Sequence, residues 1–163
     1  MKKILCVVFM LLLVGCVDTV DVKPVTQNIS FTAEMTYYNE YYEMTVDISD
    51  SGNADITVTH PKELDGLRFA IEDGTLHCEF EGLRLEVNDN HKTAAVNFLY
   101  APFFDSNQRV YKKDGEFFTK GKCDGGEYTM YITEFGLPLK LCDDAGRFEV
   151  IIKNLKVKKE KEP

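Results

Sequence analysis

Residues 29–59, ISFTAEMTYYNEYYEMTVDISDSGNADITVT, decide the fold, because apolar and polar side chains alternate along nearly all of this stretch. A period of two is typical of a β-strand that has one buried face and one wet face. Turn-forming residues at 38–41 and 50–53 divide the stretch into three runs. Because such short connections join antiparallel neighbours, we expect three consecutive strands of one antiparallel sheet here.

The alternation continues through most of the remaining chain. Further apolar runs with this period occupy residues 67–71, 76–80, 83–87, 128–132, 137–141 and 148–152, and another strand starts at 117–118. The pattern predicts a mainly β protein in which about ten strands form a sheet with one apolar face. Helical spacing occurs at 91–100, which Pro102 ends, and a second short helix is expected at 61–64.

An apolar sheet face must be covered by other parts of the chain. Only one or two short helices are available for this purpose. We therefore expect a strongly curved antiparallel sheet, a half-barrel, whose concave apolar face holds the segment 92–104.

Composition and motifs narrow the classes of function. The 163 residues, 44% of them hydrophobic, suffice for a single domain with a substantial core. The formal net charge of −8 argues against a nucleic-acid partner. Phosphate-binding loops, dinucleotide fingerprints, serine nucleophile elbows and metal-ligand spacings do not occur in the sequence. We therefore expect a binding protein rather than an enzyme, with no cofactor and no metal ion.

Residues 1–15 have the features of a secretory signal. Lys2 and Lys3 precede an apolar run at 4–14, and this run is too short for a membrane-spanning helix, which needs about 20 residues. The run ends with LVGC, residues 13–16, and this segment resembles the lipobox of bacterial lipoproteins. The resemblance implies that Cys16 carries a diacylglyceryl group and anchors an exported protein to a membrane. An ordinary signal peptide with a chance cysteine is the alternative.

Beyond this start, residues 16–27 are expected to form the lipidated N-terminus and a short tether, and residues 158–163 a charged C-terminal tail. Between them, 28–157 resembles the LolA/LolB-like group of envelope lipoproteins and lipoprotein carriers. Three features support the likeness: the lipobox and tether, the hairpin sequences HPKELDGLRF (60–69) and GTLHCEFEGLRL (74–85), and a helical interruption before the last strands. The resemblance implies an incomplete barrel, located outside the cytoplasm, with a helical lid over an apolar cavity that takes acyl chains.

The candidate ligand-facing residues lie in the helical interruption. They are Phe98, Leu99, Phe103 and Phe104. On one interpretation they line a groove for a hydrophobic ligand, either a lipid or an acylated partner. On the other they plug the concave face, and the protein is a structural or protein-interaction envelope lipoprotein with a packed core and no ligand. The membrane, through the lipid anchor, is the expected partner on both interpretations, and an envelope protein is a further possible partner.

Other candidate sites have simpler interpretations. In the sequence YYNEYY, residues 37–42, we expect Tyr37 and Tyr42 to point inward while Tyr38 and Tyr41 lie on the surface. The oxygen-rich residues at 47–55 lack the spacing of a calcium loop and are typical of a turn. Of the cysteines beyond Cys16, we expect Cys78 and Cys123 to be small buried hydrophobes and Cys142 to lie on the polar face. A disulfide between Cys123 and Cys142 would need a strand end or a bulge.

Overall fold

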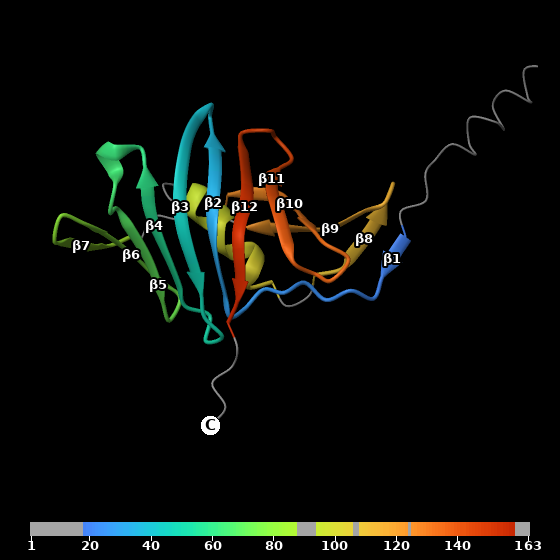
Figure 1. The fold of residues 1–163 in the computed structure, drawn as a ribbon. Coiled ribbons are helices and arrows are strands. Elements are labelled where there is room, and N and C mark those ends of the chain that lie inside the picture. Colours follow the sequence, from blue (N-terminus) through green and yellow to red (C-terminus); the bar gives the residue numbers. More distant parts are fainter. Residues whose placement is uncertain (1–17, 88–93, 106–107, 124, 159–163) are drawn as a thin grey trace, which may run out of the picture.

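The computed structural model describes residues 18–87, 94–105, 108–123 and 125–158. These residues form a single twelve-stranded antiparallel sheet with the order β1-β8-β9-β10-β11-β12-β2-β3-β4-β5-β6-β7 (Figure 1). The sheet curves around a helix and stays open, with β1 and β7 at its two edges. The prediction of a mainly β half-barrel is confirmed. The strand count of about ten, which follows from short connections between alternating runs, is low by two.

The elements follow the alternating runs of the sequence closely. The strands are β1 (Asp18–Val20), β2 (Ile29–Tyr37), β3 (Glu40–Ile48), β4 (Ala54–His60), β5 (Arg68–Glu72), β6 (Thr75–Phe80), β7 (Leu83–Glu86), β8 (Val110–Lys113), β9 (Glu116–Cys123), β10 (Gly126–Ile132), β11 (Pro138–Asp143) and β12 (Phe148–Val157). The helical elements are the 3-10 turn η1 (Lys62–Leu64), the helix α2 (Ala94–Tyr100) and the 3-10 turn η3 (Ala101–Phe103). No helix among the described residues is long and apolar enough to cross a membrane.

Cross-strand registers align the apolar positions on the concave face. Phe31 pairs with Val46, and Val46 pairs with Ile56 across the next ladder. All three side chains are buried. Because side chains of adjacent strands share a face when they are direct partners, the period-two pattern of residues 29–59 becomes one continuous apolar layer.

The short helices lie where the sequence predicts them. Helix α2 and the turn η3 pack against the concave face, behind the central strands in Figure 1. Pro102 lies in the first turn of η3, so the α-helix gives way to a 3-10 turn there. The start of the predicted helix, at 91–93, lies outside the described residues. Turn η1 follows Pro61, in agreement with the short helix expected at 61–64.

Two leucine runs differ from the expectation of burial. Leu83 and Leu85 have the predicted phase but are 71% and 65% exposed, because β7 is an edge strand that extends beyond the packed core. In β11, a register shift against β10 occurs between Tyr131 and Ile132. This bulge inverts the alternation, so Pro138 is buried and Leu139 is 48% exposed.

The segment expected to be a tether is partly integrated into the sheet. Its strand β1 pairs with β8, and three valines, Val20 at the end of β1 and Val22 and Val25 after it, pack against the core. The Val25 amide donates a hydrogen bond to the Gly136 carbonyl oxygen at 2.8 Å. We call residues 18–27 the N-terminal strap, because they run across one end of the sheet (Figure 1). Cys16 and residues 1–15 lie outside the described residues.

Candidate functional site

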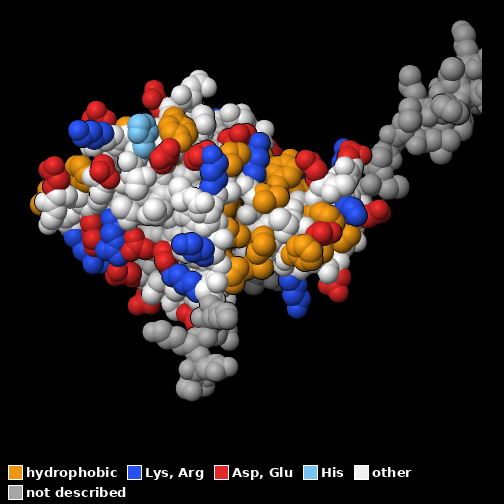
Figure 2. All heavy atoms as spheres, in the orientation of Figure 1, with side chains coloured by type: hydrophobic (Ala, Val, Ile, Leu, Met, Phe, Trp, Pro, Cys, Tyr) orange, Lys and Arg blue, Asp and Glu red, His pale blue; other side chains and the backbone are white. Residues whose placement is uncertain are grey.

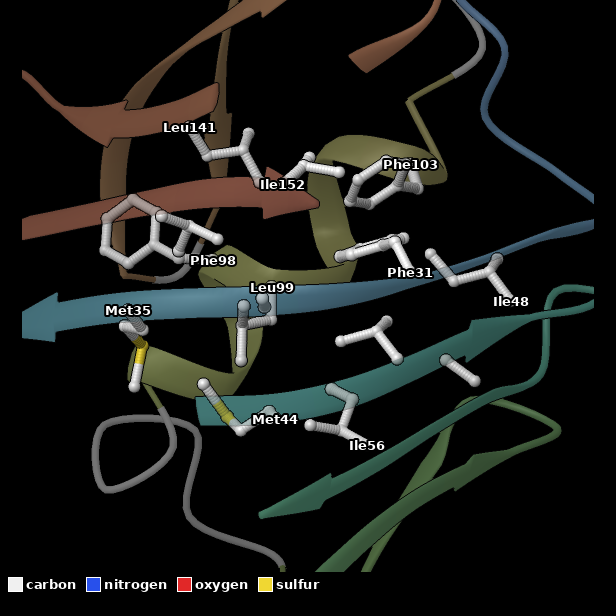
Figure 3. Packing of buried hydrophobic residues seen from close by; sticks show 14 of the residues in the cluster. Phe31, Met35, Met44, Ile48, Ile56, Phe98, Leu99, Phe103, Leu141 and Ile152 are labelled. Atoms are coloured by element: carbon white, nitrogen blue, oxygen red, sulfur yellow. The ribbon is translucent and has the colours of Figure 1, made fainter. Parts of the chain in front are cut away.

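The four residues predicted to face a ligand occupy the centre of the concave face. Phe98, Leu99 and Phe103 are 2%, 0% and 1% exposed (Figure 3). Phe98 stacks on Phe148 of β12, with ring centroids 4.6 Å apart. Phe103 packs on Phe31 of β2, with centroids 5.5 Å apart. In this conformation the side chains fill the middle of the half-barrel.

Phe104, the fourth predicted residue, is only partly buried and lies at the edge of the core. Its ring is 5.8 Å from that of Tyr100, and it also lies over Gly52 in the turn between β3 and β4. It therefore closes one end of the concave face.

An apolar cavity of about 230 Å³ lies beside α2, between the helix and strands β2 to β5. We call it the helix-side cavity. Its floor is made of four buried side chains: Met35, Met44, Val58 and Leu99. Its rim is made of partly exposed side chains: Tyr37, Tyr42, Leu64, Leu67, Phe69 and Ala95, with Val96 at the helix. Among the described residues that line it, no side chain carries a polar group apart from the two tyrosine hydroxyls.

The lining determines what this cavity can hold. Without charged side chains it offers only apolar contact, which suits a hydrocarbon chain rather than a polar metabolite. Its 230 Å³ is smaller than the roughly 300–1,000 Å³ of most small-molecule sites. Two methionines, Met35 and Met44, form part of the floor, and methionine side chains readily adapt to the shape of a neighbour. A longer chain therefore requires these side chains or α2 to move.

The apolar surface continues from the cavity towards the β7 edge. Phe69, at the rim, pairs with Cys78 of β6, and Cys78 pairs with Leu85 of β7. These direct partners share the concave face. Because Leu85 is 65% exposed, an apolar track runs from the cavity to solvent along this end of the sheet.

A polar cluster supports the other side of the helical segment. The hydroxyl of Tyr128, a side chain that is 2% exposed, donates to Asp105 Oδ2 at 3.4 Å and accepts from Gln108 Nε2 at 3.5 Å. Gln108 also donates to the Pro102 carbonyl oxygen, and Thr119 donates to Gln108 Oε1 at 3.3 Å. Burial, the main cause, raises the pKa of Tyr128 to about 12. The cluster ties η3 to strands β9 and β10.

Sequence reasoning identified the helical side of the site but not its sheet side. Met35, Met44 and Val58 were predicted only as core positions, whereas the structure brings them together as the cavity floor. The available signal was the turn at 61–64, which places Leu64 over the same strands. Tyr37 and Tyr42 pack inward, while Tyr38 and Tyr41 are 59% and 43% exposed, as the sequence predicts.

The acidic turns have structural partners. Asp55 pairs with Arg68, which also binds Glu79 with nitrogen and oxygen 2.7 Å apart. Asp47 forms an ion pair with Lys158. Within the described part of the chain, no group of three or more His, Cys, Asp and Glu side chains could hold a metal ion.

Of the cysteines beyond Cys16, Cys78 and Cys142 are free thiols in the described structure. Cys78 is half-buried on the concave face, and Cys123 packs against the core. Cys142 is also half-buried, and its thiol donates to the Thr129 carbonyl oxygen at 3.8 Å. Burial raises the pKa values of Cys78 and Cys142, which lowers their reactivity as thiolates.

Known proteins resemble this chain in structure rather than in sequence. No protein-family model matches the sequence, and no curated protein matches it. A LolA superfamily protein from Nitrosomonas europaea superimposes over 86% of this chain and 90% of its own, with a TM-score of 0.54 and 9% identity. An uncharacterized conserved protein from Thermus thermophilus covers 85% of this chain and 83% of its own, with a TM-score of 0.48 and 14% identity.

A third solved structure is a domain described as a putative outer membrane lipoprotein-sorting protein, from Vibrio parahaemolyticus. It covers 86% of this chain and 89% of its own, with a TM-score of 0.44 and 10% identity. At such identities the comparison concerns the fold alone. We base it on the Nitrosomonas europaea structure, which has the highest TM-score of the three. The open twelve-stranded sheet around a short helix is therefore a LolA-like half-barrel.

Proposed function

We propose that this chain is an exported, lipid-anchored protein that binds the hydrocarbon part of a lipid or of an acylated partner in the helix-side cavity. The single observation that supports the proposal best is the cavity lining, whose described residues are all apolar except for two tyrosine hydroxyls. The protein acts by binding rather than by catalysis. The LolA-like fold and the lipobox-like residues 13–16 agree with a site of action outside the cytoplasm.

Binding proceeds by a shift of the helical segment away from β3 to β5. Leu99 is both a core residue and a wall of the cavity, so movement of α2 enlarges the cavity and exposes the phenylalanines behind it. The hydrocarbon chain replaces those lost contacts, and each buried methylene contributes about 0.8 kcal/mol. The exposed end of the apolar track, at Leu85, is the entry.

The test uses the full chain with Cys16→Ser, so that the protein is exported without an acyl group on the cysteine. Native mass spectrometry should detect a co-purified lipid, and a fluorescent fatty acid should bind and be displaced by palmitate. Leu67→Lys places an ammonium group at the cavity rim. We expect it to lower affinity about tenfold, the equivalent of roughly two lost methylene contacts.

Val157→Lys is the matched control, because Val157 is 53% exposed on a strand that does not line the cavity. It should bind the fatty acid like the parent chain. Val58→Phe, which fills the cavity floor without adding charge, should also lower affinity. If the parent chain carries no lipid and takes up no fatty acid, the cavity is not a ligand site, and a packed protein-interaction lipoprotein is the better description.

The anchor has a separate test. The unsubstituted chain, expressed in a bacterium, should fractionate with membranes, and its mass should include the acylated cysteine. Cys16→Ser should move the protein to the soluble fraction. A chain with an unmodified Cys16 and the same fractionation as the variant would rule out the anchor without affecting the cavity.

A further inference from the structure

A row of direct cross-strand partners crosses the outer, convex face of the sheet at its β1 end. The row starts at Thr19 in β1 and continues through Tyr111 in β8, Phe118 in β9 and Tyr131 in β10 to Lys140 in β11. Because direct partners share a face, the three aromatic rings form a ladder on the side opposite to the helix-side cavity.

The rings of this ladder contact one another rather than the core. Tyr111 and Phe118 stack with centroids 5.7 Å apart, and Phe118 and Tyr131 lie 6.1 Å apart. All three are only partly buried. Phe135 and Leu139, in the adjoining connection and bulge, are 76% and 48% exposed. We call these five residues the outer aromatic surface.

A hollow of about 510 Å³ continues this surface at the ends of β9, β10 and β11. Tyr131, Phe135 and Leu139 line it together with Phe117 and Ile132, and its polar lining comes from Glu116, Thr133 and Glu134. Figure 2, which views the convex face, shows hydrophobic side chains gathered over β8 to β11. The apolar area is therefore contiguous and is not a scatter of single residues.

The other half of the convex face is entirely different in character. Over β4 to β7, Arg68 and Arg84 form a network of ion pairs with Asp55, Glu72 and Glu79. The charged groups of this face pair with one another, and such a charged face is well solvated by water. Figure 2 shows charged and polar side chains there in place of the hydrophobic area.

Lysines flank the outer aromatic surface. Lys120 and Lys122 follow Phe118 at every second position of β9 and therefore lie on the same convex face. Both are exposed, and neither forms an ion pair with any residue in the part of the chain that the structure describes. Tyrosine rings with free ammonium groups around them match the boundary between phospholipid headgroups and acyl chains.

The position of the predicted anchor identifies what covers this surface. Cys16 precedes the first residue of β1, Asp18, by two residues, and two residues of extended chain span at most about 7 Å. Because β1 is hydrogen-bonded to β8, an acyl group on Cys16 holds the β8 edge at the bilayer. The aromatic row begins at Thr19, one residue further along the same strand.

We propose that the outer aromatic surface rests on the headgroup region of the membrane that carries the anchor. This proposal relies on the lipid anchor of the proposed function and is independent of ligand binding. It orients the domain: the convex face of β8 to β11 lies against the bilayer, while the helix-side cavity faces away from it. The ion-paired half of the sheet extends into the aqueous phase.

The test exploits the absence of tryptophan from the chain. Single substitutions Phe118→Trp and Phe135→Trp place one fluorescent reporter in the surface, and Tyr41→Trp places one on the exposed β2–β3 hairpin. The full-length lipidated variants are reconstituted in vesicles of phosphatidylethanolamine and phosphatidylglycerol, with or without brominated acyl chains. Bromine quenches only a reporter that reaches the boundary of the acyl region.

We expect the brominated vesicles to cause loss of fluorescence for Phe118→Trp and Phe135→Trp but not for Tyr41→Trp. Flotation of the vesicles shows independently whether each protein is anchored to them. If the proteins float and none of the reporters is quenched, the anchor stands and the outer aromatic surface has another partner, which overturns this proposal. If the proteins do not float and Cys16 is unmodified, the anchor and this proposal fail together, whereas fatty-acid uptake by the cavity is unaffected.

Lys120→Glu combined with Lys122→Glu gives a second readout. In the Phe118→Trp background, the double substitution replaces two ammonium groups, which anionic headgroups attract, by two carboxylates, which they repel. Quenching should decrease while flotation is retained. Unchanged quenching would contradict the orientation, because the lysines would then face away from the lipid.

Discussion

Asp143 shows how one buried side chain fixes a hairpin. Its side chain is 1% exposed. The carboxylate accepts hydrogen bonds from the Arg147 amide at 2.7 Å, the Phe148 amide at 3.0 Å and Arg147 Nε at 2.8 Å. These hydrogen bonds close the turn between β11 and β12. Because Phe148 also stacks on Phe98, the turn helps to place the helical segment.

Asp143→Ala should lower the free energy of unfolding by about 3 kcal/mol, because two backbone amides and a guanidinium group lose their acceptor. Urea denaturation measures the change. Asp144→Asn is the control at the neighbouring, exposed position, because it keeps the side-chain oxygen that accepts from Thr129, and it should stay within about 0.5 kcal/mol of the parent. Equal effects of the two substitutions would show that the side chain of Asp143 does not stabilise the hairpin.

Tyr128 predicts how stability depends on alkaline pH. Its pKa rises from 10.0 to about 12 on folding, chiefly through burial. Below pH 10 the phenol is neutral in both states, so its contribution is complete. As the pH rises from about 10 to about 12, the unfolded chain loses the proton first, and stability falls.

Urea denaturation over this alkaline range checks the sign of the effect. Tyr128→Phe should weaken the pH dependence without abolishing it, because the hydrogen bond to Glu43 raises the pKa of Tyr41 to about 12 as well. An identical slope in parent and variant would mean that Tyr128 titrates normally in the folded state.

At the scale of an element, the N-terminal strap depends on a close approach at Gly136. A Cβ atom there would lie 2.1 Å from the Lys23 carbonyl oxygen, so only glycine lets the strap pass. The residue also has a φ of +81°, which glycine adopts without strain.

Gly136→Ala should therefore detach the strap from the connection between β10 and β11. Gly115→Ala is a matched control, because Gly115 has a similar φ of +89° but open space around its Cβ position. Hydrogen exchange of the Val25 amide should become faster in the first variant and stay unchanged in the second. If this amide stayed protected in both variants, contacts other than the close approach at Gly136 would hold the strap in place.

At the scale of the whole molecule, the sequence predicted the sheet because its alternation is local, whereas the arrangement of the edges depends on distant contacts. Nothing in DTV, residues 18–20, distinguishes a three-residue strand from a tether until β8 is present to pair with it. Leu139 and Leu85 have the residue type and phase of core positions. A bulge exposes the first and an edge exposes the second, and neither cause is visible in the local pattern.

The candidate site was predictable to the same extent. Of the segment predicted at 92–104, the described residues 94–104 lie on the concave face, because Phe98 and Leu99 follow helical spacing and are buried by apolar contacts there. The cavity lies beside the helix rather than under it, because the large rings of Phe98 and Phe103 fill the centre of the half-barrel. Which part of the concave face is filled and which is left as a cavity depends on packing between distant residues, so the local sequence pattern does not predict it.

The middle of the sheet joins β2, from the start of the domain, to β12, from its end. During synthesis, residues 29–37 have no partner on one side until residues 148–157 have emerged. The central pairing of the sheet therefore forms late, and until then the open edge of β2 can bind chaperones that hold nascent polypeptides.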